Sequence, residues 1–333
     1  MQVRRKLRNG RGASRIQLSV ILTAQELLSE KAGHPVNTEH LFLVTHQTFE
    51  LWFKQILRDL HHLRCLFIDA TSWCKTPLGP IRATLDRVVR IFQLINQQFH
   101  ILETMGPMDF AEFRGLYGSA SGFQSLQFRL IEITLGLRPE NRVLYNCVEY
   151  RTAFEAEDQQ RLAEAEAQPS LNQLVEAWLE KIPELSNFQR AFAQGSRDYA
   201  EATAASEQEK LQLHAMFRTL LDDAEHEELR GKGERRWSQA AWLAGLCLHF
   251  HRDSPQFSPA HAILSLLQDL ETQLSTWRHN HLLLVLRMLG KKAGTGGSSG
   301  YQYLRSTNCD RYRIFLDLFL MSTFLFPRWF LKY

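Results

Sequence analysis

The chain has 333 residues, of which 44% are hydrophobic and 23% are charged, and its formal net charge is +3 at pH 7. This composition is typical of a globular protein with a substantial core, and no run approaches the roughly 18 apolar residues of a membrane-spanning helix, so we expect no membrane association. Residues 1–15 carry six basic and no acidic side chains; the remaining chain therefore has a net negative charge, which argues against a nucleic-acid-binding protein.

The basic residues 1–15 are predicted to form a disordered N-terminal arm. A mitochondrial targeting segment and a nucleic-acid-binding tail are the alternatives for such a composition. The five cysteines are odd in number and form no CxxC pair, and no secretory signal opens the sequence. We therefore expect a reduced, cytoplasmic protein.

Helical periodicity dominates the chain, and no segment shows the alternation of a half-buried strand. The sequence predicts an all-α helical bundle with long central helices. Ser258 is the expected cap of the helix that starts at Pro259, and Gly290 is the expected end of that helix. Residues 154–212, rich in Ala, Gln and Glu, are predicted to form a solvent-exposed helical excursion. The predicted helices span 17–31, 38–68, 81–104, 121–136, 170–180, 207–229, 235–251, 259–289 and 307–324.

An aromatic stripe follows one face of the helix predicted over 38–68. Phe42, His46, Phe49 and Phe53 recur at helical spacing, so they share this face. A histidine in such a stripe is either a core residue hydrogen-bonded to a neighbour or a polar group that faces a ligand in an apolar pocket.

Phe110 and Arg114 are four residues apart and would meet on one face of a short helix. The Arg114 side chain could extend to solvent. Alternatively, its planar guanidinium could bind a carboxylate beside an aromatic wall.

The helix predicted over 259–289 carries a second histidine on an apolar face, where Trp277 and His281 are one turn apart. His281 could be a core residue, or a neutral imidazole that ligates haem iron. His279 would point to the opposite side. A zinc site is poorly supported, because there is no HExxH motif and no cysteine at ligand spacing.

The glycine-rich stretch "AGTGGSSG" (293–300) follows this helix directly. It lacks the GK[ST] of a P-loop, and it follows a helix rather than the strand that precedes a dinucleotide-binding loop. Apolar and aromatic segments flank it on both sides. We therefore predict a ligand-binding loop packed against the core, with Thr295 offering a hydroxyl and the glycines allowing close backbone approach.

Three blocks of the chain together resemble the tryptophan 2,3-dioxygenase family, and the resemblance extends over about residues 16–328. The blocks are "EHLFLVTHQTFELWFKQI" (39–56), "SASGFQSLQFRLIE" (119–132), and "WRHNHLLLVLRMLGKKAGTGGSSGYQYLRST" (277–307) followed by "DRYRIFLDLFLMSTFLFPR" (310–328). The resemblance implies a helical domain enclosing a b-type haem, ferrous in its active form, with 329–333 as a C-terminal end. It further implies a homotetramer that uses L-tryptophan and O2 to form N-formyl-L-kynurenine, the first step of tryptophan catabolism by the kynurenine pathway.

The same resemblance implies roles for individual residues. His281 would be the axial ligand of the haem iron, with Trp277 and Ser121 beside the haem. His46 would be the catalytic histidine that accepts the indole N–H, Arg114 would bind the substrate carboxylate, and Thr295 would lie at the substrate ammonium group. The implied substrate contacts are Phe42, Leu43, Val44, Thr45, His46, Phe110, Arg114 and Thr295.

The chain departs from the family pattern at two places. The family's Tyr-Gly-x-Tyr-Leu segment, which reaches into a neighbouring subunit's pocket, corresponds here to 12–16, "GASRI", which contains no tyrosine. Tyr117 stands where an apolar residue is common at the pocket edge. The missing tyrosine segment makes a catalytically impaired member that still binds haem and tryptophan the alternative to an active dioxygenase, and Tyr117 could reshape the pocket for a different indole substrate.

Overall fold

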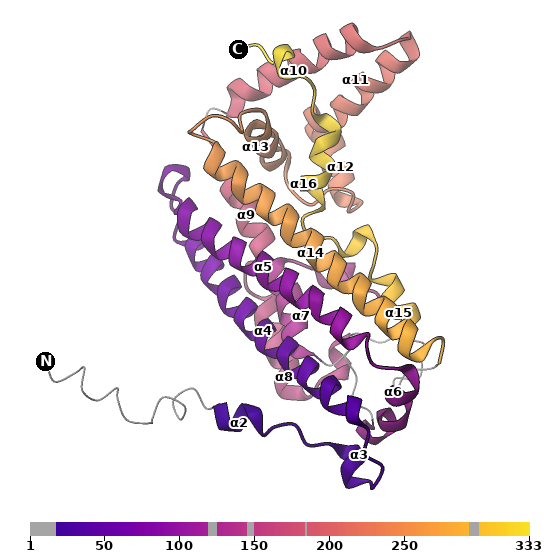
Figure 1. The fold of residues 1–333 in the computed structure, drawn as a ribbon. Coiled ribbons are helices and arrows are strands. Elements are labelled where there is room, and N and C mark those ends of the chain that lie inside the picture. The colour runs from indigo at the N-terminus through magenta and orange to yellow at the C-terminus, as the bar shows by residue number, and fades with distance from the viewer. Residues whose placement is uncertain (1–17, 119–124, 145–149, 184, 293–299) are drawn as a thin grey trace, which may run out of the picture.

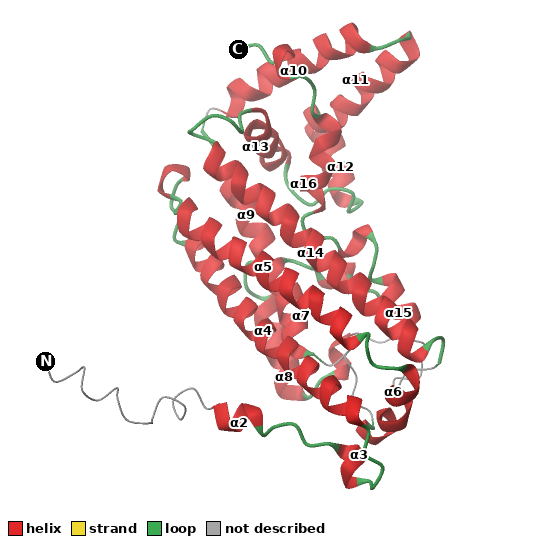
Figure 2. Ribbon diagram, viewed as in Figure 1, coloured by secondary structure: helices red, strands yellow, loops and turns green. Residues whose placement is uncertain are grey.

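The computed structural model describes residues 18–118, 125–144, 150–183, 185–292 and 300–333, and every regular element within these ranges is a helix, as Figure 2 shows. The predicted all-α fold is confirmed. The α-helices are α2 (Leu18–Leu22), α3 (Leu28–Lys31), α4 (Asn37–Ile68), α5 (Leu78–Leu102), α6 (Pro107–Arg114), α7 (Leu126–Leu135), α8 (Ala156–Glu166), α9 (Leu171–Leu179), α10 (Leu185–Thr203), α11 (Glu207–Leu221), α12 (Asp223–Gly231), α13 (Gln239–Phe250), α14 (Ser258–Leu289), α15 (Gly300–Ser306) and α16 (Leu316–Leu320). Short 3-10 turns join them: η2 (Trp73–Lys75), η3 (Gly115–Tyr117), η5 (Pro139–Asn141), η6 (Tyr150–Ala153), η7 (Asp310–Tyr312), η8 (Met321–Phe324) and η9 (Arg328–Phe330).

The long helices α4, α5 and α14 form the centre of the bundle and run side by side (Figure 1). Helix α14 packs along α5, and α4 packs between α5 and α7. Their facing side chains are fully buried, as at Leu60, Phe92 and Leu267. Burial of such a side chain stabilises the fold by about 1.5–3 kcal/mol, so this apolar seam fixes the relative position of the three helices. None of the described helices is long and apolar enough to cross a bilayer.

The ends of α14 follow from its sequence, with one correction. Pro259 lies in the first turn, where its missing N–H has no helical partner to lose. Ser258 is already the first helical residue and makes no capping bond, so its predicted role as a cap is wrong. Gly290 ends the helix with a φ of +60°, as predicted, because this left-handed backbone suits glycine.

Three predicted helices are interrupted in the structure. The helix expected over 17–31 divides into α2 and α3, and the one over 207–229 divides where Asp222 caps α12 through Glu225 N. The helix expected over 307–324 is replaced by η7, α16 and η8. There, the backbone amides of Ile314 and Phe315 donate to the buried carboxylate of Glu271 on α14. Because those amides point at a side chain, they cannot continue a helical ladder.

The prediction that residues 154–212 are solvent-exposed is wrong for two of the helices in this range. Helix α9 buries Val175 and Trp178 in the main core, and α10 buries Phe188 and Phe192 there. The Ala, Gln and Glu that suggested exposure occupy the outer faces of amphipathic helices.

A buried carboxylate joins α7 to α14. Glu132 on α7 accepts hydrogen bonds from Arg129 (3.0 Å) and Arg142 (2.7 Å), and from Arg278 of α14 (3.0 Å). Burial alone would raise the pKa of Glu132, but the three guanidinium groups hold it far below its ordinary value. Arg278 also donates to the Tyr312 carbonyl, so one residue of α14 is tied to two other segments.

Replacing Glu132 with glutamine should therefore destabilise the fold. The Glu132→Gln variant leaves three buried guanidinium groups without their shared charge, and removing one partner of such a buried set costs about 3–5 kcal/mol. Urea unfolding of the two proteins measures this difference. The control is Asp86→Asn, which breaks an exposed pair with Arg90 and should cost less than about 1 kcal/mol. Equal stability of the Glu132→Gln variant and the wild type would contradict the assigned role.

Candidate functional site

Most of the predicted site residues that the structure describes gather at the end of the bundle where the first half of α4 meets the last turns of α14. Helix α6 contacts both α4 and α14 at this end, and η3 follows it directly (Figure 1). The site is thus assembled from segments far apart in the sequence.

His46 is held in one tautomer by its own helix. Its Nδ1 lies 2.7 Å from the carbonyl oxygen of Phe42, so Nδ1 carries the proton and donates it. Burial lowers the pKa of His46, with smaller opposing effects from that hydrogen bond and the Glu50 charge. The ring is therefore neutral at pH 7, and its Nε2 is available as a hydrogen-bond acceptor.

Aromatic rings surround His46 on one side. The Phe42 ring centroid lies 4.1 Å from that of His46, 5.8 Å from Phe110 and 5.3 Å from Phe113. Tyr117 closes this group, 5.8 Å from Phe42. The structure thus brings together Phe42, His46 and Phe110, which the sequence predicted, with Tyr117, which it placed at the pocket edge, and adds Phe113. The result is an apolar wall with one imidazole acceptor.

His281 lies on a second aromatic wall. Its ring centroid is 5.2 Å from Trp277 and 6.5 Å from Phe99, while Trp277 stacks on Phe128 at 4.2 Å. Part of the His281 surface stays accessible, yet the surrounding protein desolvates the ring and lowers its pKa to about 4, with smaller contributions from His46 and Arg129. Among the described residues none hydrogen-bonds to this ring. His281 is therefore a neutral imidazole able to coordinate a metal.

Helix α4 contributes to both walls and connects them. Phe49 of α4 lies 5.3 Å from Phe99 and 6.3 Å from Trp277. Since Phe49 is one turn beyond His46 on the same helix, the two imidazoles lie at either end of one aromatic assembly. The protonation of one histidine is electrostatically linked to the other, as the effect of His46 on the pKa of His281 shows.

Arg114 is the last residue of α6 and is half-buried. Its Nη1 donates to the carbonyl oxygen of Gly118 at 3.3 Å, across the η3 turn. Phe110, one turn earlier on α6, places an aromatic ring on the same helical face. The predicted combination of a guanidinium and an aromatic wall is therefore present.

The other predicted site residues differ in whether the structure describes them and in how far they are buried. Ser121 and Thr295 lie outside the described residues. On α4, Thr45 is buried and Leu43 half-buried, whereas Val44 is 38% exposed. Val44 is two residues from both Phe42 and His46, which places it on the other side of the helix. The structure does not bring Val44 to the aromatic wall.

Sequence reasoning missed three phenylalanines of the aromatic assembly and one carboxylate. Phe99 and Phe128 were readable as core positions of periodic helices, and Phe113 shared a helix with Phe110. Glu39 is fully buried at the start of α4, where it accepts a hydrogen bond from Tyr117. No local pattern relates these two, because 78 residues separate them.

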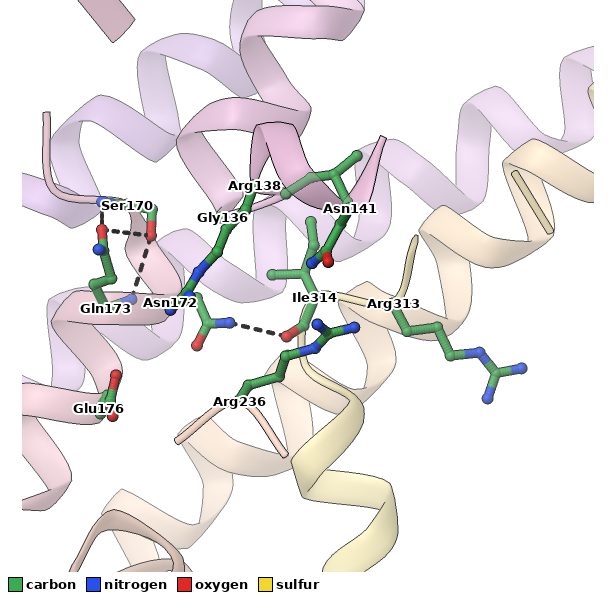
Figure 3. Close-up of a pocket in the computed structure, with 11 residues that line it drawn as sticks. Gly136, Arg138, Asn141, Ser170, Asn172, Gln173, Glu176, Arg236, Arg313 and Ile314 are labelled. Carbon is green, nitrogen blue, oxygen red and sulfur yellow. Dashed lines mark hydrogen bonds between the residues drawn. The ribbon is translucent and has the colours of Figure 1, made fainter. Parts of the chain in front are cut away.

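A separate polar pocket lies between the end of α7, the start of α9 and the segment after η7 (Figure 3). Asn172 spans it, donating to the Ile314 carbonyl at 2.9 Å and accepting from the Trp237 indole. Gly136 has a φ of +128°, and a β-carbon there would come within 2.8 Å of Asn172. This pocket contains none of the predicted site residues, and its contacts describe a tightly packed joint between segments.

Comparison with known proteins decides the family. The family model described as tryptophan 2,3-dioxygenase matches residues 12–325. The chain is 44% identical to tryptophan 2,3-dioxygenase of Mus musculus, 43% to that of Xenopus laevis and 42% to tryptophan 2,3-dioxygenase A of Danio rerio. Each match covers 94% of this chain and 81% of the relative. The chain belongs to the tryptophan 2,3-dioxygenase family.

Tryptophan 2,3-dioxygenases depend on haem, and the residues present here fit that group. The His281 imidazole is neutral, lies in an aromatic wall and is free of hydrogen bonds among the described residues. The buried Trp277 Nε1 also finds no acceptor in the described part of the chain. One axial histidine is enough for a haem, whereas no group of three or more His, Cys, Asp or Glu is arranged to hold a metal ion within the described ranges.

Replacing His281 with alanine should remove the haem or its axial bond. We expect the His281→Ala variant to lose haem during purification, or to show a changed Soret band that added imidazole restores. The matched control is His279→Ala, because His279 is exposed on the opposite side of α14 and should leave the spectrum unchanged. An unaltered Soret band in the His281→Ala variant would exclude His281 as the ligand.

The neutral state of His46 predicts how tryptophan binding varies with pH. Because burial lowers the pKa of His46 below its ordinary value of 6.5, its Nε2 should be an unprotonated acceptor at pH 7 to 8. The KM for L-tryptophan should therefore rise in acidic buffer with a midpoint below pH 6.5. The His46→Phe variant should lack this acidic rise. A wild-type midpoint at or above pH 6.5 would contradict the assignment.

Proposed function

We propose that this chain is a haem-dependent dioxygenase that inserts O2 across the indole C2–C3 bond of L-tryptophan, forming N-formyl-L-kynurenine. Membership of the tryptophan 2,3-dioxygenase family supports the reaction. The observation that carries the site is that His46 and His281, both kept neutral by burial, lie on two aromatic walls that α4 connects at one end of the bundle. We further propose that the protein acts in the cytoplasm as a homotetramer.

Tryptophan offers four features that a binding site can recognise: an apolar bicycle, an indole N–H, a carboxylate and an ammonium group. The Phe42, Phe110 and Phe113 rings supply an apolar slot for the bicycle. The free Nε2 of His46 would accept the indole N–H, since Nδ1 is already committed to the Phe42 carbonyl. A site with a partner for each feature binds one orientation of the substrate.

The zwitterionic end of the substrate would lie toward α6. Arg114 would bind the carboxylate through two parallel N–H···O bonds, a geometry that its planar guanidinium favours. Thr295 would contact the ammonium group, and Ser121 would lie at the haem edge. These two assignments, and Leu43 and Thr45 as further candidate contacts, are supported by the family resemblance; Val44 is not among them, because it is exposed on the other side of α4.

His281 would hold the haem through its neutral imidazole, with Trp277 beside it. When bound, ferrous haem supplies the activation of dioxygen that protein side chains cannot provide. The chain's own contribution is orientation and the exclusion of water. Burial keeps His281 in the neutral form that coordinates iron, and the aromatic wall keeps the reacting end of the site apolar.

His46 is best described as a positioning group. Its hydrogen bond to the Phe42 carbonyl fixes the ring on the helix, and its lowered pKa keeps Nε2 unprotonated. An indole N–H is a very weak acid, so a histidine of lowered basicity would accept a hydrogen bond from it rather than remove its proton.

Arg114 should determine the preference for a substrate with a carboxylate. In an Arg114→Gln variant, loss of a charge-assisted bond worth about 1.5–3 kcal/mol should raise the KM for L-tryptophan roughly ten- to a hundredfold. Tryptamine lacks the carboxylate, so its inhibition constant should change little. Both constants follow from formylkynurenine formation monitored by absorbance.

The matched control is Arg82→Gln, which removes an exposed guanidinium from α5 and should leave both constants unchanged. An equal rise in the KM for L-tryptophan and the inhibition constant of tryptamine in the Arg114→Gln variant would show that Arg114 does not bind the carboxylate. Absence of product from the haem-loaded wild type would overturn the proposed reaction itself.

A further inference from the structure

Tyr117 is anchored by a buried carboxylate. Its hydroxyl donates to Oε1 of Glu39 at 2.7 Å, and Glu39 has no exposed surface. Burial and the adjacent carboxylate raise the pKa of Tyr117, so the hydroxyl keeps its proton and acts as the donor. A hydrogen bond to a charged, desolvated acceptor is among the stronger ones in proteins, so this contact restricts where η3 can lie.

Glu39 is itself held by a second segment. The amides of Leu28 and Ser29 donate to its two oxygens at 2.9 and 3.0 Å. Burial alone would raise the pKa of Glu39, but hydrogen bonds from Ser29 and Tyr117 outweigh it and lower the pKa. The carboxylate is therefore ionised at neutral pH and joins α3, the first turn of α4 and η3 at one point.

The anchored turn carries a hydrogen-bond partner of Arg114. Tyr117 is the last residue of η3, and the next residue, Gly118, accepts a hydrogen bond from Arg114 Nη1 through its carbonyl oxygen. Displacement of Tyr117 would move that carbonyl and so disturb one of the contacts that orient the guanidinium. The Tyr117 ring also contacts Phe42, whose ring and carbonyl both contact His46.

We propose that Tyr117 is a positioning residue for substrate recognition: by donating to Glu39 it holds the Gly115–Gly118 turn in place and thereby orients Arg114 toward the substrate carboxylate. The inference rests on the proposed function for the role of Arg114, whereas the anchoring of the turn stands on the contacts alone. We call the Tyr117 hydroxyl, the Glu39 carboxylate and the amides of Leu28 and Ser29 the latch. It connects the segment before α4 to the carboxylate end of the site.

The test removes only the hydroxyl. In a Tyr117→Phe variant the ring stays and the latch is lost, so we expect the KM for L-tryptophan to rise about three- to tenfold with kcat within about twofold of wild type. The inhibition constant of tryptamine should not change, because tryptamine has no carboxylate for Arg114. The matched control is Tyr199→Phe on α10, a distant tyrosine whose ring packs on Phe326.

Amide hydrogen exchange tests the latch without turnover. Peptides covering 26–32 and 113–118 should exchange faster in the Tyr117→Phe variant than in wild type, while those of α5 should not. If the KM for L-tryptophan and the inhibition constant of tryptamine rise equally, or neither rises, Tyr117 does not position Arg114 and the inference is wrong. If exchange is unchanged, the latch itself is wrong. A wild type that forms no product defeats the proposed function, and the exchange result still decides the latch.

Discussion

The relative placement of α7 and α14 depends on the carboxylate of Glu132. It accepts hydrogen bonds from three arginines, and one of these, Arg278, follows Trp277 directly and precedes His281 by one turn. Trp277 stacks on Phe128, the neighbour of Arg129, so an aromatic contact and an ionic contact join the same two helices at adjacent residues. Because buried ionic contacts tolerate little displacement, the rotation of α14 is fixed there, and with it the direction in which His281 points.

The site then follows from burial on an aromatic wall. Desolvation lowers the pKa of both His46 and His281, so both rings are neutral. The two rings differ in which of their nitrogens are already hydrogen-bonded. His46 has one nitrogen committed to the Phe42 carbonyl and one left as an acceptor. His281 has no such commitment among the described residues, so it can serve as a metal ligand. Two residues of the same type thus acquire different roles from the hydrogen bond that one makes and the other lacks.

Periodicity was sufficient to predict the parts of this arrangement that lie on single helices. The spacing of Phe42, His46 and Phe49 placed them on one face of α4, and the same reasoning placed Trp277 beside His281; the structure confirms both faces. Prediction failed where a distant side chain decides the backbone. The segment 17–31 reads as one helix, yet Glu39 takes the amides of Leu28 and Ser29 and holds α3 as a separate turn. The contact of Tyr117 with Glu39 was likewise beyond any local pattern, because tertiary packing alone brings the two together.

Buried carboxylates recur in this fold with the same task of holding irregular backbone. Glu39 accepts from two successive amides before α4, Glu271 from those of Ile314 and Phe315, and Asp317 from those of Arg236 and Trp237. Each acceptor satisfies amides that would otherwise be buried without partners, which is costly in a core. A bundle of long helices needs such devices where the chain must change direction against its core. Glu39 is the one of the three that lies beside the site, and there the same carboxylate also receives the Tyr117 hydroxyl. The Glu39 carboxylate therefore holds the irregular segment before α4 and, through Tyr117, also orients the arginine proposed to bind substrate.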